Sequence, residues 1–79
     1  MEEILTRRFT PDPRYGDNVR AEVKRARRTQ TSVAMAIGMS WPEWTRRTGG
    51  QVSWRIDELT AVAAELRIPL QRLTNGGDH

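Results

Sequence analysis

Hydrophobic residues recur along this chain at the three- and four-residue spacing that is typical of amphipathic helices. The longest regular run predicts a helix over residues 54–66. Its apolar face consists of Ile56, Leu59, Val62, Ala63 and Leu66. Asp57 and Glu58 lie in its first turns, where negative charge is favourable to the helix dipole. No segment alternates in the way that indicates a strand, so the chain is expected to be all-α.

The N-terminal part of the chain divides into an arm and a helix. Proline and glycine interrupt residues 1–16, which are therefore expected to form an extended or flexible arm. Three alternatives stay open for this arm: it lies in a DNA minor groove, packs on a partner subunit, or is disordered. A helix is predicted over residues 18–28, with Asp17 as its N-cap. Its apolar face consists of Val19, Val23 and Ala26.

The segment 29–48 predicts two short helices joined by a tight turn, over residues 31–37 and 41–48. Gly38 supplies the left-handed backbone that such a turn needs. Ser40 is a favourable N-cap, and Pro42 fits near the first helical position. The apolar side chains of this unit are Val33, Ala34, Ile37, Met39 and Trp44. The arrangement has the spacing of a helix-turn-helix, whose second helix enters the DNA major groove.

A fifth short helix is predicted near the C-terminus, opened by Pro69 and ending near Thr74, with Leu70 and Leu73 facing inward. Glycine pairs at 49–50 and 76–77 stop the preceding helices. The pattern therefore predicts five short helices in one bundle over residues 17–76, followed by a tail over residues 77–79. A chain of 79 residues buries only a modest core.

The helix-turn-helix segment resembles the phage repressor and Cro type of helix-turn-helix DNA-binding family (XRE-like). The resemblance covers residues 18–76. The matching residues of the first part are Thr29-Gln30, Val33-Ala34, Ile37-Gly38-Met39-Ser40, Trp44 and Gly50. Those of the second part are Ile56, Leu59, Val62-Ala63, Leu66, Ile68, Leu70 and Leu73-Thr74-Asn75-Gly76. The family implies a lambda-repressor-like bundle.

The resemblance also implies a function, which is sequence-specific binding of double-stranded DNA by a transcriptional repressor of the phage Cro or immunity type. Such proteins bind palindromic operators as dimers. We expect a homodimer that is weak or forms on DNA, with its interface near Leu70, Arg72 and Leu73.

The family pattern assigns DNA contacts to eight residues. Gln30 matches a position that contacts backbone phosphate and braces the recognition helix, and Ser40 matches one that caps that helix and touches phosphate. The base readers by position are Trp41, Pro42, Thr45 and Arg46, while Arg28 and Arg47 complete the DNA-binding set. Arg46 is the principal reader, because a guanidinium can bond guanine O6 and N7 together. Trp44 and Trp54 are expected in the core.

The sequence departs from the family pattern at two positions of the second helix. Arg47 stands where an apolar residue normally anchors that helix, and either its side chain swings outward to phosphate or the helix is rotated. Thr48 stands where an acidic residue often pairs with a basic one on the first helix. Val23 is the matching residue there, so an apolar Val23–Thr48 contact is expected instead.

The charge distribution supports a polyanion-binding face. Residues 7–47 hold ten basic and four acidic residues, whereas residues 55–79 hold three basic and four acidic ones. A basic front and a near-neutral back suit a one-sided nucleic-acid surface, although charge alone is also typical of an ordinary solvated helical surface.

Several classes are excluded by composition. The chain lacks cysteine and has one histidine, so neither a disulfide framework nor a metal site is expected, and no cofactor is implied. No catalytic Ser/His/Asp set, phosphate-binding glycine loop or carboxylate pair in an apolar pocket is present, so an enzyme is not expected. Without an apolar run that spans a membrane or an N-terminal signal pattern, we expect a cytoplasmic protein in a bacterial or phage-infected cell. The alternative to a DNA-binding regulator is an antitoxin-type or other protein-interaction module on the same fold, with the arm 1–16 covering its target.

Overall fold

The computed structural model describes residues 13–74, and all regular structure in this part is helical. The helices are α2 (Pro13–Arg25), α3 (Gln30–Ala36), α4 (Trp41–Thr48), α5 (Ile56–Leu66) and α6 (Gln71–Thr74). The predicted all-α bundle of short helices is therefore confirmed for the described residues. The expected arm up to residue 12 and the tail 77–79 lie outside them.

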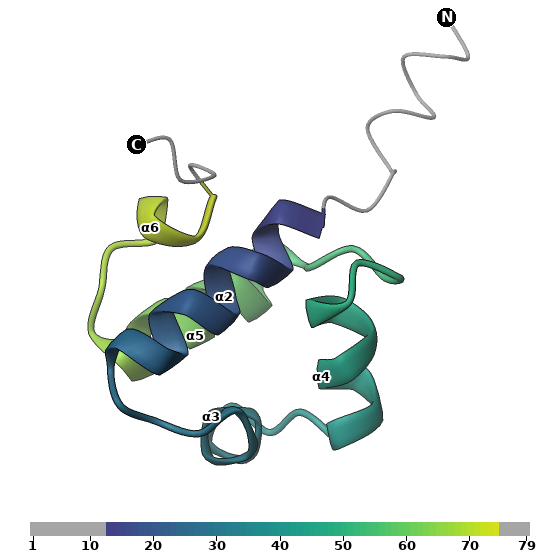
Figure 1. Ribbon diagram of the computed structural model, residues 1–79, viewed down its shortest axis with the longest axis horizontal. Coiled ribbons are helices and arrows are strands. Elements are labelled where there is room, and N and C mark those ends of the chain that lie inside the picture. The colour runs from purple at the N-terminus through teal and green to yellow at the C-terminus, as the bar shows by residue number, and fades with distance from the viewer. Residues whose placement is uncertain (1–12, 75–79) are drawn as a thin grey trace, which may run out of the picture.

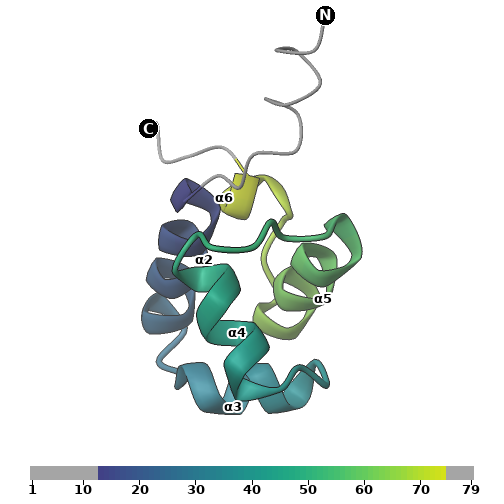
Figure 2. The same cartoon turned by 90° about the vertical axis from the view of Figure 1, so that its right-hand side faces the viewer.

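The helices surround a single core (Figures 1 and 2). In Figure 2, α2 and α5 stand on either side of α4, α3 crosses at the base, and α6 closes the top. Contacts join α2 to each of the other four helices, so α2 is the central helix of the bundle. The buried apolar residues are Val19, Val23, Val33, Ala34, Trp44, Trp54, Leu59, Val62, Ala63, Leu66 and Leu73.

The bounds of α2 differ from the prediction at both ends. The helix begins at Pro13, not after Asp17, and Asp17 lies inside it with its carboxylate paired to Arg20. Proline suits the first turn of a helix because the N–H it lacks would have no partner there, so Pro13 begins a helix and does not belong to an extended arm. The expectation of an arm through residue 16 and of Asp17 as an N-cap is wrong. Ala26, expected in the core, is exposed beyond the end of α2.

The other boundaries shift by smaller amounts. Helix α3 begins and ends one position before the prediction, with Thr29 as its N-cap accepting a hydrogen bond from the Ser32 N–H at 3.1 Å. Helix α4 has the predicted bounds. Helix α5 begins at Ile56, whose side chain is 64% exposed and does not belong to the core. Trp54, just before it, is buried as predicted.

Four of the helices end in the same hydrogen-bonded turn. In each, the residue in the left-handed region donates its N–H to the carbonyl three residues before it, and the next residue donates to the carbonyl five before itself. This is the Schellman motif, which satisfies carbonyls that the helix end leaves free. The left-handed residues are Arg27 after α2, Gly38 after α3, Gly50 after α4 and Arg67 after α5.

Helix α6 is fastened to α2. Leu73 is fully buried, and its carbonyl accepts a hydrogen bond from Asn18 Nδ2 at 2.9 Å. Arg72 pairs with the buried carboxylate of Glu22 at 3.3 Å. Leu70 packs partly against the core. Because Leu73 serves the core of its own chain, it is not available to the dimer interface that the sequence placed on this segment.

Candidate nucleic-acid interface

The turn between α3 and α4 is built as the sequence predicts. Gly38 has a φ of 77°, and the N–H groups of Gly38 and Met39 bond back to the carbonyls of Met35 and Ala34 at 3.1 and 2.9 Å. Met39 is partly buried against the core beneath the turn. The chain can therefore leave α3 and begin α4 in a new direction within four residues, as Figure 2 shows.

Helix α4 starts with a complete capping box. Ser40 Oγ accepts the Glu43 N–H at 3.3 Å, and Glu43 Oε1 accepts the Ser40 N–H at 3.2 Å. The hydrogen bonds from the Ser40 backbone and hydroxyl hold the pKa of Glu43 below its ordinary value of 4.5, and Arg47 and Arg46 add to this effect. Glu43 is therefore ionised at neutral pH and fixes the start of α4.

One side of α4 is anchored in the core by Trp44. This side chain is fully buried, and its indole Nε1 donates to Gln30 Oε1 of α3 at 2.8 Å. The bracing of α4 by Gln30, which the sequence predicted, is thus present as a direct hydrogen bond. Trp54 packs edge-on against Trp44 with ring centroids 5.7 Å apart. Among the described residues, none accepts a hydrogen bond from the buried Trp54 Nε1.

The C-terminal end of α4 is held against α2. Arg20 Nη1 donates to the Thr48 carbonyl at 2.7 Å, and the buried Thr48 hydroxyl donates to the Trp44 carbonyl at 3.0 Å. Gly16 lies so close that a Cβ there would be 2.2 Å from the Thr48 carbonyl oxygen. A polar link to Thr48 therefore does exist, but it comes from Arg20 and reaches the backbone. Sequence reasoning missed Gly16 and Arg20 in this role because it placed Gly16 in the arm.

The opposite side of α4 is open to solvent. The four predicted base readers, Trp41, Pro42, Thr45 and Arg46, are all exposed, and Trp41 is 48% exposed. Successive helical residues are turned by about 100°, so Pro42 and Arg46 lie opposite the buried side, whereas Trp41 lies next to Thr48 at its edge. The Thr45 hydroxyl donates to the Pro42 carbonyl at 3.0 Å. Within the described part of the chain, the Arg46 guanidinium has no hydrogen-bonding or ion-pair partner.

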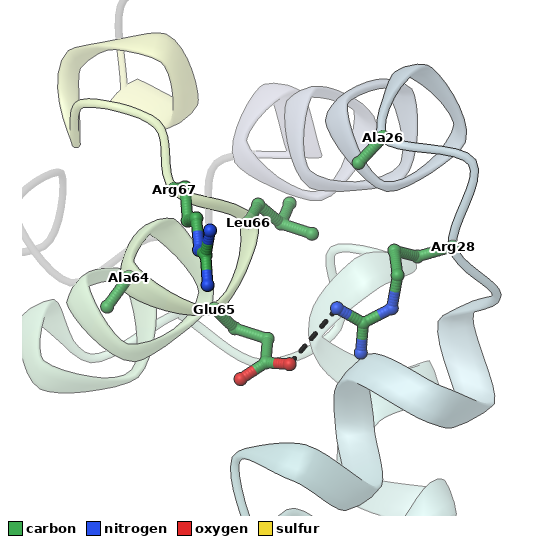
Figure 3. A pocket seen from close by; sticks show the side chains of 6 residues that line it. All are labelled: Ala26, Arg28, Ala64, Glu65, Leu66 and Arg67. Carbon is green, nitrogen blue, oxygen red and sulfur yellow. Dashed lines mark ion pairs between the residues drawn. The ribbon is translucent and has the colours of Figure 1, made fainter.

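Arg47 and Arg28, both predicted to contact DNA, each form an ion pair within the protein. Arg47 Nε pairs with Glu58 Oε1 at 2.8 Å, and both side chains are more than 80% buried. The prediction that Arg47 swings outward is wrong, because Arg47 anchors α4 to α5 by an ion pair. Arg28 pairs with Glu65 of α5 at 3.0 Å across a small hollow at the ends of α2 and α5 (Figure 3).

The described residues offer no metal-binding cluster and no membrane-spanning helix. No group of three or more His, Cys, Asp or Glu side chains in this part of the chain lies together in a way that suits a metal ion. Among the described helices, none combines the length and apolar character needed to cross a membrane.

Comparisons with protein-family models, with curated proteins and with solved structures gave no significant match.

Proposed function

We propose that this chain is a sequence-specific double-stranded DNA-binding regulator that inserts α4 into the major groove. The observation that carries the proposal is that α4 has a buried and an exposed surface: Trp44 and Thr48 lie in the core, and the four predicted readers are exposed around the rest of the helix. An α-helix with its side chains is about 10–12 Å in diameter, which fits the width of about 12 Å of the B-DNA major groove. A rigid, outward-facing helix of this size is the element that reads base edges in helix-turn-helix proteins.

Arg46 is the central reader in this proposal. Its guanidinium is exposed and unpaired within the described residues, so binding a base requires no internal ion pair to be broken. A guanidinium fork can donate to guanine O6 and N7 together, which contributes about 1–3 kcal/mol of discrimination. Thr45 offers its methyl group to a thymine methyl, and Trp41 offers an apolar surface to a base or a sugar.

The biological setting is part of the same proposal. Two copies on a palindromic operator would place their α4 helices about one helical turn apart, which suits a phage Cro or immunity-type repressor acting in the cytoplasm. Pairing of the two copies on DNA, rather than through a dedicated domain, fits a described part that is one small bundle.

The experiment measures binding to the DNA upstream of the gene and to a scrambled duplex across a salt series. Arg46→Gln is compared with the control Arg25→Gln. The control also removes one positive charge, but from an α2 side chain that pairs with Glu22. Wild type and Arg25→Gln should prefer the upstream DNA, and Arg46→Gln should lose about 5- to 150-fold of that preference. Salt-sensitive binding without any preference would reduce the proposal to a basic surface. The absence of binding would favour the antitoxin-type interaction module.

A further inference from the structure

Glu43 lies on the open side of α4, although the family resemblance does not include it among the DNA contacts. Its side chain is exposed. With a turn of about 100° per residue, Arg46 lies opposite the midpoint of the buried residues of α4, and Glu43 lies about 60° from Arg46. By the same rule, Thr45 and Trp41 lie about 100° and 140° from Arg46. Glu43 is therefore nearer to the centre of the open side than two of the predicted base readers.

The carboxylate of Glu43 is held in place through one of its two oxygens. Oε1 accepts a hydrogen bond from the Ser40 N–H at 3.2 Å and another from Ser40 Oγ at 3.0 Å. The other oxygen, Oε2, has no hydrogen bond within residues 13–74. Because the capping box already restricts this side chain, presenting Oε2 to a ligand costs little further side-chain entropy.

The charge of Glu43 decides which ligand this oxygen can take. The hydrogen bonds from Ser40, together with Arg47 and Arg46, lower the pKa of Glu43, so the carboxylate is ionised at neutral pH. An ionised carboxylate can only accept hydrogen bonds. In a DNA groove it is repelled by the phosphates, and only a donor on a base edge offsets this repulsion.

The major groove offers few such donors. Guanine presents two acceptors there and thymine presents an acceptor and a methyl group, so neither suits a carboxylate. Adenine presents its amino group beside the acceptor N7, whereas cytosine presents its N4 amino group without an acceptor beside it. Cytosine is therefore the base that an ionised carboxylate distinguishes best.

We infer that Glu43 is a specificity-determining residue that accepts a hydrogen bond from the N4 amino group of a cytosine in the major groove. The inference rests on the proposed function and adds a base reader to it. Glu43 and Arg46 are separated by about 4.5 Å along the helix axis, and bases on one strand are about 3.4 Å apart. The cytosine is therefore expected in the base pair next to the guanine that Arg46 binds.

The test measures the affinity for a duplex with the preferred upstream site and for duplexes with each single base-pair substitution in that site. Glu43→Gln keeps an oxygen for the Ser40 donors and replaces the other oxygen by an amino group, which suits adenine and not cytosine. The matched control is Asp57→Asn, because Asp57 is an exposed acidic residue in the first turn of α5. Thermal melts verify that both variants fold.

Wild type should bind at least about fivefold more weakly when the cytosine is replaced by any other base. Glu43→Gln should lose this discrimination, favour adenine at the same position and bind scrambled DNA more tightly, because one negative charge is removed. Asp57→Asn should keep the wild-type preference for cytosine. Arg46→Gln should lose the guanine preference at the neighbouring base pair.

The failure of the inference is distinguishable from the failure of the proposed function. If Glu43→Gln ranks the substituted duplexes as wild type does while Arg46→Gln loses the guanine preference, Glu43 only caps α4. The inference is then overturned and the proposed function stands. If wild type shows no sequence preference at all, the proposed function fails and the inference fails with it.

A second measurement uses wild type alone and does not depend on the folding of a variant. Replacing the cytosine by N4-methylcytosine keeps the base pair and removes the N–H that faces the major groove. Wild type should bind this duplex at least about fivefold more weakly than the unmodified one. Equal binding of the two duplexes would overturn the assignment of Glu43 to the cytosine amino group.

Discussion

Replacing Gly16 with alanine tests the contact that sets the position of α4 against α2. A Cβ at this position would be 2.2 Å from the Thr48 carbonyl oxygen and 2.7 and 2.8 Å from the Thr48 C and Cα atoms. Ordinary van der Waals contact begins at 3.4 Å, so the Cβ would be more than 1 Å too close to the oxygen. All three atoms are backbone, and no side-chain rotation relieves the clash. Helix α2 must therefore move away from the end of α4.

The expected cost follows from two opposing effects. Overpacking a rigid contact costs about 1–3 kcal/mol and occasionally more, whereas replacing glycine by alanine within a helix returns about 0.5–1 kcal/mol. Because the clash is with backbone, we expect the upper end of the first range and a net loss of about 2 kcal/mol. A domain of this size is stable by about 4–12 kcal/mol, and this loss lowers its melting temperature by about 8–16 °C.

The assay is thermal and urea denaturation followed by circular dichroism, with Gly38→Ala as the matched glycine-to-alanine control. A Cβ on Gly38 meets nothing within 4 Å, so this control suffers only the cost of its positive φ, about 1–2 kcal/mol. Gly16→Ala should also weaken the preference for upstream DNA, because α4 is displaced, while Gly38→Ala should affect stability first. A Gly16→Ala protein that melts at or above the wild-type temperature would refute the close approach of α2 and α4.

Three further predictions concern single side chains. Arg67→Gly should stabilise the protein by up to about 1 kcal/mol, because an arginine at a φ of 59° is strained and a glycine is not; an unchanged or lower melting temperature would contradict this. Gln30→Ala should cost about 1–3 kcal/mol by leaving the buried Trp44 N–H without a partner, whereas Gln30→Glu keeps the acceptor and should weaken only DNA binding; equal stability losses in the two variants would argue against the indole–amide bond. Folding lowers the pKa of Glu43, so its negative charge stabilises the folded protein at pH values above the ordinary pKa of 4.5. This contribution is lost as the pH falls through the lowered pKa. Melts of wild type and Glu43→Gln across pH should therefore converge in acid, and a constant difference would show that the charge is not involved.

The helix-turn-helix unit could be predicted from the sequence because its signals are local. Gly38, Ser40 and Pro42 each fit a turn or cap through their own backbone chemistry, and all three have their predicted places. The apolar face of α5 was likewise predicted except for Ile56. These features depend on a few neighbouring residues, which a single sequence contains in full.

The errors occur where the deciding interaction is distant in sequence or has no residue signature. Arginine gives no indication of a left-handed backbone, so the left-handed turns at Arg27 and Arg67 could not be anticipated as the one at Gly38 was. Gly16 looked like part of a broken arm because its partner, Thr48, is on another helix. The same limitation applies to the arginines, because a sequence shows their charges but not which carboxylate lies beside each of them in the fold.

The pairing of arginines changes what the basic composition means for DNA binding. Six arginines each pair with a carboxylate of the same chain. They are Arg20, Arg25, Arg28, Arg47, Arg55 and Arg72. Among residues 15–74, the cations without such partners are Lys24, Arg27, Arg46 and Arg67. Each phosphate contact contributes about 0.9 to the salt slope, so these four cations together should contribute no more than about 4 per protomer. The described residues alone therefore contribute little non-specific affinity, and any selectivity that they give must come from the fit of α4 in the groove.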